Sequence, residues 1–381
     1  MATTLPAGVA FAALLHALPL LGAVFVPLDP RAQVAAGARV TVTEPPGGDE
    51  AEVPLRQTVD PDAVHSIIHT SGTTGRPKAV ELTYGNHHAS ARAAAGAVGV
   101  ASDDRWLCPL PPFHVGGLAV LIRCAINATT AVLWDGFDAG RVRAALEAGE
   151  ATLASLVPTM LERLREAGLA RAPGLRAIAL GGGPIRPALL EWAAGAGIPV
   201  VPVYGLTETA SQVVAGLPGR PLPGAELRIG RDGEVLVRGP MVARNARDAD
   251  GWLHTGDRGR LDAAGRLHLD GRLKEIIVTG GENVAPAEVE GVLLGHAAVA
   301  DAGVVGLPDP EWGEAVTAYV VLRDRATPAE LLAWCRARLP AYKVPKRVER
   351  VPQLPRNAAG KLRRDQITPP SADAPGIFRP P

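Results

Sequence analysis

The chain has 381 residues, which is too long for one ordinary domain and short for three. Lys plus Arg and Asp plus Glu each number 39, so the net charge is zero, whereas a general nucleic-acid binder would carry a basic excess. Hydrophobic residues make up 47%, enough for a large core. The cysteines, Cys108, Cys124 and Cys335, are dispersed without metal-type spacing, which is typical of a reduced, cytoplasmic protein.

An apolar segment near the N-terminus, residues 9–28, needs a separate interpretation. No basic residue stands in the first seven positions, as a signal peptide would require. The segment is long enough for a membrane span, but His16 and Pro19 interrupt it. The sequence therefore predicts a buried helix followed by a buried strand.

A stretch rich in glycine and hydroxyl groups follows a predicted strand at residues 64–68. It reads His69-Thr70-Ser71-Gly72-Thr73-Thr74-Gly75-Arg76-Pro77-Lys78. Gly72 and Gly75 tolerate positive φ, so the backbone N–H groups can turn into one concavity, and Lys78 adds a positive charge. That combination suits a polyphosphate better than it suits a solvated turn. The loop is not a Walker A motif, because Pro77 precedes the lysine and no Ser or Thr follows it.

This loop closely resembles the signature of the adenylate-forming superfamily, which includes acyl-CoA synthetases, luciferases and the adenylation domains of peptide synthetases. The resemblance implies ATP and Mg²⁺ as cofactors and coenzyme A as co-substrate. In that family a carboxylate becomes an acyl-adenylate, and a thiol then takes the acyl group. The residues that the resemblance assigns to ATP in this loop are Thr70, Ser71, Gly72, Thr73, Thr74, Gly75 and Lys78.

Predicted strands and helices alternate through the middle of the chain, which indicates a parallel α/β sheet. The strands are predicted at residues 105–110, 132–134, 152–157, 176–180 and 200–203, and the helices at 86–98, 117–126, 139–148 and 158–167. Ligands of such sheets bind beyond the carboxyl ends of the strands. We expect both the phosphate loop and Gly181-Gly182-Gly183 there. The triple glycine resembles the adenine-binding segment of the family, in which Gly182 and Gly183 contact the nucleotide.

The first of these strands runs into Pro111-Pro112-Phe113-His114-Val115-Gly116-Gly117-Leu118. A lone histidine there is ordinarily packed or caps a helix, but this segment resembles the acyl-pocket motif of the family. The resemblance implies substrate contacts from His114, Gly117, Arg123, Gly181 and Gly205, with a catalytic role for His114. Arg123 interrupts an otherwise apolar helix, so it either makes the pocket tolerant of an anion or forms a scaffold salt bridge.

The segment Tyr204-Gly205-Leu206-Thr207-Glu208-Thr209 matches a second family motif. Tyr204, beside Gly205, can stack on adenine. Thr207 can hydrogen-bond the α-phosphate, and Glu208 can hold Mg²⁺ through its carboxylate. The alternative is a plain strand-to-helix N-cap, which accounts for Thr207 and Glu208 alone.

The remaining site residues come from later motifs, and their roles are implied by the resemblance. Asp257, in Trp252-Leu253-His254-Thr255-Gly256-Asp257, and Arg272 correspond to ribose contacts. Lys274 corresponds to a hinge, Gly281 to a glycine loop along the pantetheine tunnel, and Lys361 to a catalytic lysine that swings into the site.

The predicted fold class is α/β. A large ATP- and acyl-binding domain, residues 1–273, combines parallel sheets flanked by helices with a small β subdomain at 226–229, 234–238 and 266–269, and it is reduced at its N-terminus compared with the family. A hinge leads to a small, mobile α+β domain at 274–367, with helices at 286–294 and 328–339 and strands at 299–305, 315–322 and 347–351. The Pro-rich tail 368–381 is predicted to be disordered.

Within the superfamily, residues 113–118 with Arg123, together with residues 207–212, most resemble the members that attach 2-succinylbenzoate to coenzyme A in menaquinone biosynthesis. The alternatives are another aryl- or fatty-acyl-CoA ligase and a non-catalytic nucleotide-binding relic. A peptide-synthetase module is disfavoured because no pocket Asp stands near His114. The expected partners are a small carboxylate, ATP and coenzyme A, without nucleic acid or a membrane span. A homodimer is left open.

Overall fold

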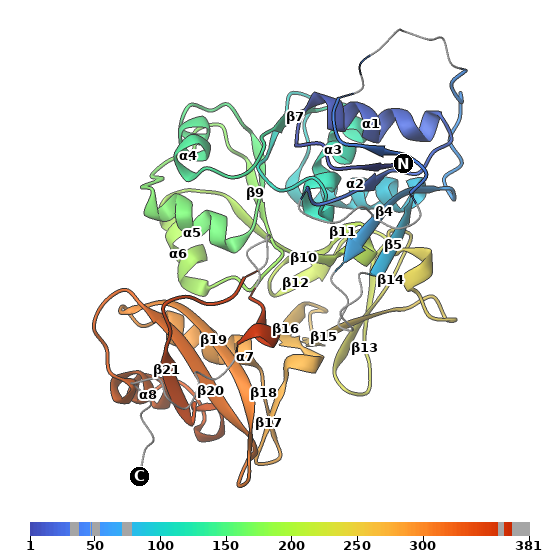
Figure 1. Ribbon diagram of the computed structural model, residues 1–381. Coiled ribbons are helices and arrows are strands. Elements are labelled where there is room, and N and C mark those ends of the chain that lie inside the picture. The colour runs from blue at the N-terminus through green and yellow to red at the C-terminus, as the bar shows by residue number, and fades with distance from the viewer. Residues whose placement is uncertain (31–37, 46, 48–53, 71–77, 357–361, 368–381) are drawn as a thin grey trace. The chain divides into compact units, whose positions relative to one another are not determined.

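The computed structural model describes residues 1–30, 38–45, 47, 54–70, 78–356 and 362–367 (Figure 1). The predictions for Ser71, Gly72, Thr73, Thr74 and Gly75, for Lys361 and for the tail lie outside these residues. The chain divides into two compact units. The first comprises Met1–Arg228, Leu236–Thr255 and Leu261–Leu267, and the second comprises Ile229–Val235, Gly256–Arg260 and His268–Pro381.

The first unit contains the predicted parallel sheet. Its strands pair in the order β7 (Thr130–Leu133), β6 (Arg105–Cys108), β8 (Leu153–Leu156), β9 (Ala177–Leu180) and β10 (Val200–Leu206). The antiparallel strand β11 (Ser211–Gly216) pairs with β10, and β12 (Gly219–Pro221) pairs with β11. The α/β class is confirmed, but β10 runs three residues past the predicted end at residue 203.

Helices cover both faces of this sheet, because its side chains alternate between them. In β6, Leu107 packs in one buried cluster, while Trp106 and Cys108 belong to another. The first cluster includes residues of α4 (Ala139–Glu147), α5 (Pro158–Glu166) and α6 (Pro187–Gly195). Figure 1 shows these three helices close together. The second lies under α2 (Tyr84–Val98) and α3 (Val115–Asn127). The result is a three-layer sandwich with apolar side chains on both sides of the sheet.

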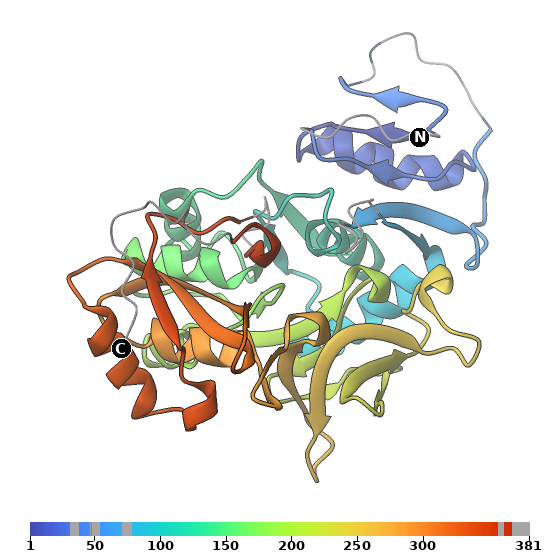
Figure 2. The ribbon, with the colours of Figure 1, turned by 60° about the horizontal axis from the view of Figure 1, so that its bottom comes forward.

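The N-terminal segment forms α1 (Val9–Leu20) and the strands β1 (Ala2–Thr3), β2 (Val26–Pro27) and β3 (Thr41–Val42) (Figure 2). The predicted helix followed by a strand is confirmed. Phe11 of α1 is buried edge-on against Phe25, with ring centroids 5.2 Å apart. Among the residues that the structure describes, no helix has the length and apolar character needed to span a membrane.

The strands on either side of the phosphate loop differ from the expected arrangement. β4 (Val64–Thr70) pairs antiparallel with β5 (Lys78–Thr83), and together they form a separate two-stranded sheet. The expectation that the loop follows a strand of the parallel sheet is therefore wrong. The physical reason is length, because parallel strands need a crossover of about a dozen residues, whereas residues 71–77 can join only antiparallel neighbours.

The predicted small β region is also present. It consists of β13 (Glu226–Ile229), β14 (Glu234–Arg238), β15 (Leu253–Leu261) and β16 (Leu267–Arg272), whose residues are divided between the two units. Short 3-10 turns occur at η1 (Thr207–Thr209), η2 (Arg244–Ala246), η3 (Leu273–Glu275), η4 (Ala341–Lys343) and η5 (Arg364–Gln366).

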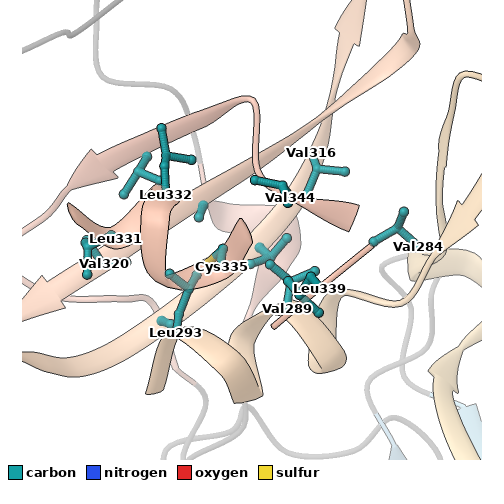
Figure 3. Close-up of a cluster of buried hydrophobic side chains, with 14 of the residues drawn as sticks. Val284, Val289, Leu293, Val316, Val320, Leu331, Leu332, Cys335, Leu339 and Val344 are labelled. Carbon is teal, nitrogen blue, oxygen red and sulfur yellow. The ribbon is translucent and has the colours of Figure 1, made fainter. Parts of the chain in front are cut away.

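The second unit has its own sheet, in the order β18 (Glu282–Val284), β17 (Ile277–Thr279), β20 (Gly313–Leu322) and β19 (Val299–Asp309), with β21 (Arg347–Arg350) parallel to β20. Helices α7 (Pro286–Leu294) and α8 (Pro328–Arg336) close its core, which includes Val289, Leu293, Val316, Val320 and Cys335 (Figure 3). Thr327 caps α8 in a capping box with Glu330, as its position before Pro328 predicts.

Two buried histidines join β4 to α2 in the first unit. The rings of His65 and His87 lie 5.0 Å apart, and Ser66 Oγ is 2.8 Å from His87 Nε2. Burial, reinforced by His16, lowers the pKa of His65 to about 4. Burial also lowers the pKa of His87 well below its usual range, and His65 and Arg123 add to that effect. Both rings are therefore neutral in the folded chain at pH 7.

Acidification is expected to destabilise this unit. In the unfolded chain both histidines titrate near their ordinary value of about 6.5. Below that pH the unfolded chain binds more protons than the folded chain, so stability falls as pH falls. Each histidine then costs about 1.4 kcal/mol of unfolding free energy per pH unit, until its folded-state pKa is reached. Urea unfolding between pH 7.5 and 5.0 measures the slope, and His87→Gln should flatten it. An unchanged slope in that variant would contradict the assignment.

Candidate active site

The turn between β10 and β11 presents the central motif of the site. Instead of leading into an α-helix, residues Thr207–Thr209 form the 3-10 turn η1 and the chain reverses into β11. The N-cap alternative for Thr207 and Glu208 is therefore wrong. Both residues are half-buried and stand at the carboxyl end of the parallel strand β10, where ligands of such sheets bind.

The side chain of Thr209, which is fully buried, organises this turn. Its Oγ1 accepts a hydrogen bond from Leu206 N at 2.9 Å and lies 2.6 Å from Ser211 O, to which it can donate. Ala210 and Ser211 then adopt positive φ values of 51° and 112°, which are rare for residues with side chains. Such backbone persists only where its surroundings hold it in place.

Two neighbouring segments supply that support. Ser90 Oγ of α2 donates to Ala210 O at 2.8 Å, and Ala243 N donates to Glu208 O at 2.8 Å. The amide of Asn86, also on α2, donates to Pro240 O at 2.7 Å and to Val242 O at 3.1 Å. Helix α2 therefore fixes both the turn and the segment beside it. The sequence gives no signal for these contacts, because Ser90 and Ala210 are 120 positions apart.

The donor set of the turn fits Mg²⁺. Glu208 offers a carboxylate and Thr207 a hydroxyl, both hard oxygen donors. Across the described part of the chain, no group of three His, Cys, Asp or Glu side chains could hold a metal ion. Mg²⁺ is commonly bound by one or two carboxylates together with the phosphates of a substrate. A single carboxylate therefore suits a Mg²⁺ ion that arrives with a nucleotide.

Three of the predicted glycines are required by the protein's own backbone. A Cβ on Gly205 would lie 1.9 Å from Ser211 O, one on Gly181 would lie 2.7 Å from Val203 O, and one on Gly117 would lie 2.4 Å from Pro111 O. Gly182 differs, because it has a φ of +81°, which side chains disfavour, and a Cβ on Gly183 would make only ordinary van der Waals contact with Pro158, at 3.9 Å. Gly182 and Gly183 lie just beyond the end of β9 at Leu180.

Tyr204 and the ends of the phosphate loop belong to the same unit. Tyr204 lies near the end of β10 and is 9% exposed, so little of its ring is accessible. Its stacking on adenine stays a prediction. Thr70 ends β4 and pairs with Lys78, which begins β5 and is exposed. The two described ends of the loop are therefore side by side.

His114 is the N-cap residue of α3 through its backbone, since His114 O accepts hydrogen bonds from Gly117 N and Leu118 N. Its side chain makes no capping hydrogen bond, so the interpretation as a side-chain cap is wrong. The half-buried ring packs against Phe113, with centroids 4.7 Å apart.

Arg123 lies two turns further along α3 and is 3% exposed. Its Nη1 reaches Gln212 Oε1 only at 3.5 Å, and its guanidinium lies 5.7 Å from the centre of the Trp106 ring. Nε and Nη2 have no hydrogen-bond partner among the described residues, and Gln212 Nε2 has none either. Burial lowers the pKa of Arg123 to about 10, so the side chain remains a cation at neutral pH.

No carboxylate in the described residues pairs with Arg123, so these residues give no support to the scaffold salt bridge. A buried cation without a counter-ion is costly, and unmade hydrogen bonds add to that cost. The guanidinium therefore offers two buried donors to an anion of suitable shape.

The second unit brings together the two residues predicted to bind ribose. Asp257 of β15 is nearly buried, and Arg272 Nε at the end of β16 lies 3.0 Å from Asp257 Oδ1. Gly256 has a φ of +68° and its N–H donates to Glu234 Oε1 at 2.8 Å. This hydrogen bond fixes the backbone beside Asp257.

Lys274 and Gly281 lie in the same unit. Lys274 is the middle residue of η3, directly after β16. Gly280 and Gly281, with φ values of +57° and +82°, form the two-residue turn of the β17–β18 hairpin. Positive φ at both central residues is the requirement of a type I′ turn. Among the described residues other than its two chain neighbours, no atom lies within 4 Å of the position of a Cβ on Gly281, so a side chain would meet nothing there.

The comparisons with known proteins identify the family. Residues 32–245 match the family described as AMP-binding enzyme, and residues 288–361 match its C-terminal domain. The 2-succinylbenzoate–CoA ligase of Bacillus subtilis (strain 168) is 41% identical over 344 residues, which are 83% of this chain and 71% of that protein. The enzyme of the same name from Bacillus cereus (strain ATCC 10987) is 41% identical over 350 residues, 84% of this chain and 73% of that protein.

Solved structures agree. The o-succinylbenzoate CoA synthetase of Bacillus subtilis in complex with the acyl-adenylate intermediate superposes with a TM-score of 0.88 at 35% identity, covering 97% of this chain and 88% of that one. The same enzyme with ATP and magnesium ion gives 0.86 at 35% identity, covering 96% and 88%. The chain belongs to the AMP-binding enzyme family, and the resemblance predicted from its sequence is confirmed.

The buried hydrogen bonds of Thr209 in η1 lead to a prediction about the stability of the fold, for which Thr207 provides a matched control. Thr209→Val keeps the shape of the side chain but removes the hydroxyl that bonds Leu206 and Ser211, and it should cost about 1–3 kcal/mol of unfolding free energy. Thr207→Val, two residues away, removes a half-buried hydroxyl and should cost about 0.5 kcal/mol or less. Urea unfolding monitored by circular dichroism measures both values. Equal losses would contradict the assigned role of Thr209.

Proposed function

We propose that this chain is an AMP-forming acid–CoA ligase that converts 2-succinylbenzoate to 2-succinylbenzoyl-CoA, a step of menaquinone biosynthesis. The observation that carries the substrate is the buried guanidinium of Arg123, which has two unsatisfied donors and no carboxylate partner among the described residues. 2-Succinylbenzoate has two carboxylates, so one can be activated while the other stays charged. The relatives that carry this activity in their names support the same substrate.

The reaction has two steps. A carboxylate oxygen of the substrate attacks the α-phosphorus of ATP and pyrophosphate leaves. The thiol of coenzyme A then attacks the acyl carbon, and AMP leaves. No nucleophilic side chain is needed, so the protein's task is to align the reacting atoms and to stabilise negative charge.

Each residue of the first unit has a proposed role in that task. Thr207 hydrogen-bonds the α-phosphate, and Glu208 holds Mg²⁺, which neutralises phosphate charge when bound. The loop from Thr70 to Lys78 holds the outer phosphates, and Tyr204, Gly182 and Gly183 border the adenine. His114, Gly117, Gly181 and Gly205 border the acyl pocket, where Arg123 receives the second carboxylate directly or through a water or a partner side chain.

The second unit has the complementary roles. Asp257 and Arg272 bind the ribose hydroxyls, and Lys361 supplies positive charge during adenylate formation. The domain that begins at residue 274 then turns about Lys274, which removes Lys361 and brings the Gly281 hairpin to the entering thiol. A cytoplasmic setting is part of the proposal, because Cys108, Cys124 and Cys335 are buried free thiols. A homodimer stays a prediction.

A carboxylate panel tests the substrate. Purified protein with ATP, Mg²⁺ and coenzyme A should form a thioester from 2-succinylbenzoate faster than from octanoate, benzoate or 4-coumarate at equal concentration. Faster use of octanoate or 4-coumarate would reject the assignment and leave a general acyl-CoA ligase. No pyrophosphate release with any acid would favour a nucleotide-binding relic.

The same panel of acids tests whether Arg123 binds the second carboxylate of the substrate. An unpaired carboxylate in an apolar pocket costs several kcal/mol, so Arg123→Met should lower kcat/KM for 2-succinylbenzoate by about 100-fold or more. The loss on benzoate should be much smaller, because benzoate has no second carboxylate. Replacing a buried, unpaired cation by a similar apolar volume should not reduce stability. An equal loss on both acids, or unfolding of the variant, would place Arg123 in the scaffold.

Substitution of Lys361 tests whether this residue acts only in the first step, adenylate formation. Lys361→Ala should strongly reduce pyrophosphate release, because a positive charge near the α-phosphate is lost. Thioester formation from supplied 2-succinylbenzoyl-adenylate and coenzyme A should remain largely intact. The neighbouring Arg363→Gln serves as a matched loss of charge, since Arg363 pairs with the exposed Asp365. Equal losses in both steps of Lys361→Ala would contradict its assignment to adenylation.

A further inference from the structure

The residue after the proposed hinge belongs to an ion-pair network that no part of the proposed function uses. Glu275 ends η3, and its Oε2 accepts a hydrogen bond from Arg364 Nη1. The same guanidinium binds Glu290 of α7 through Nη2, at 2.7 Å from Oε2 and 2.8 Å from Oε1, and through Nε at 3.2 Å from Oε1. One arginine therefore connects the hinge-side turn to the body of the second unit.

The Glu290 end of this network is firmly held. The Glu290 side chain is 8% exposed, and its Oε1 also accepts from Val304 N of β19 at 2.9 Å. Burial raises the pKa of Glu290, and the Arg364 guanidinium opposes that rise. The buried carboxylate of Glu290 accepts hydrogen bonds from a bidentate guanidinium and from a backbone N–H, so its hydrogen-bonding requirements are met. Glu290 therefore holds the Arg364 guanidinium in a fixed position.

Residues around Arg364 are attached to the same body. Arg356 and Leu362 form an antiparallel bridge, Arg363 N donates to Pro355 O at 2.9 Å, and Arg356 pairs with Asp301 of β19 at 2.6 Å. The position of Arg364 is thus set by the β19–α7 core, and Glu275 is the more exposed of its two carboxylate partners, with 30% of its side chain exposed compared with 8% for Glu290.

The other side of the hinge is also ion-paired. Arg272, two residues before Lys274, pairs with Asp257 at 3.0 Å. Only Leu273 and Lys274 stand between these two ion-paired positions. We infer, on the basis of the proposed function, that Arg364 is a positioning residue that acts through Glu275. Its ion pair holds residue 275 to the core of the second unit, so that the hinge extends no further than Lys274 and the chain from residue 275 onward turns as one body.

Two variants break the link on the hinge side. Glu275→Ala removes the carboxylate that is more exposed. Arg364→Lys keeps a cation against Glu290, but a single ammonium lacks the fork that can hold two carboxylates at once. Arg363→Gln is the matched control, because Arg363 stands beside Arg364 in the chain but pairs with the neighbouring Asp365.

Hydrogen exchange of the protein without substrate tests the link itself. Amides of residues 273–276 should exchange about ten-fold faster or more in Glu275→Ala, the factor expected from loss of a hydrogen bond to a charged group. Arg364→Lys should give a similar increase, and the double variant should add little to either single change. Arg363→Gln should leave the rate unchanged. An unchanged rate in Glu275→Ala would overturn the inference, whatever reaction the protein catalyses.

Kinetics of the two half-reactions test the positioning role. In Glu275→Ala the rates of pyrophosphate release and of thioester formation from supplied adenylate should both fall about five-fold, with the KM for ATP unchanged. A residue with a merely structural role would leave the rates of the folded protein intact. Faster exchange with wild-type rates would therefore reject the positioning role. Absence of ligase activity in the wild-type protein would instead reject the proposed function and leave the exchange result standing.

Discussion

The backbone of Gly205 approaches Ser211 so closely that no side chain fits between them, and the candidate site depends on this approach. A Cβ on Gly205 would lie 1.9 Å from Ser211 O. A register shift between Tyr204 and Gly205 lies beside it in the antiparallel ladder with β11, while the earlier residues of β10, Val200 to Pro202, pair parallel with β9. The chain then reverses within η1, so Thr207 and Glu208 stand at the end of the parallel sheet instead of starting a helix.

Arg123 differs from Gly205, because its buried guanidinium reduces the stability of the protein when no ligand is bound. Its neighbours on α3 are buried and apolar, and the nearest acceptor among the described residues, Gln212 Oε1, lies at the outer limit of a hydrogen bond. A residue selected only for stability at this position would be apolar. In the proposed function, an anionic ligand that satisfies the guanidinium recovers this cost on binding, and the arginine selects a dicarboxylate over a monocarboxylate.

Much of the fold was predictable because its elements follow local rules. Short apolar runs that alternate with helices located the strands of the parallel sheet, and α7 and β14 have the predicted bounds. The errors arose where tertiary pairing prevails over local pattern. The predicted strand ends at residue 203, but pairing with β11 extends β10 through Tyr204 and Gly205. The site motifs were local and could be found, whereas the contacts that hold them could not. Arg123 and Gln212 are 89 positions apart, as are Glu275 and Arg364.

A short hinge has a physical advantage for a protein that must adopt two orientations. Each residue has only two soft backbone dihedrals, so two residues between fixed positions provide about four. With so few degrees of freedom, the chain loses little entropy when it settles into either orientation, and each orientation is well defined. In the proposed hinge, the ion pairs Asp257–Arg272 and Glu275–Arg364 supply the fixed positions on either side of Leu273 and Lys274. A longer unpaired stretch would permit the same rotation, but it would position the catalytic groups less accurately in both steps.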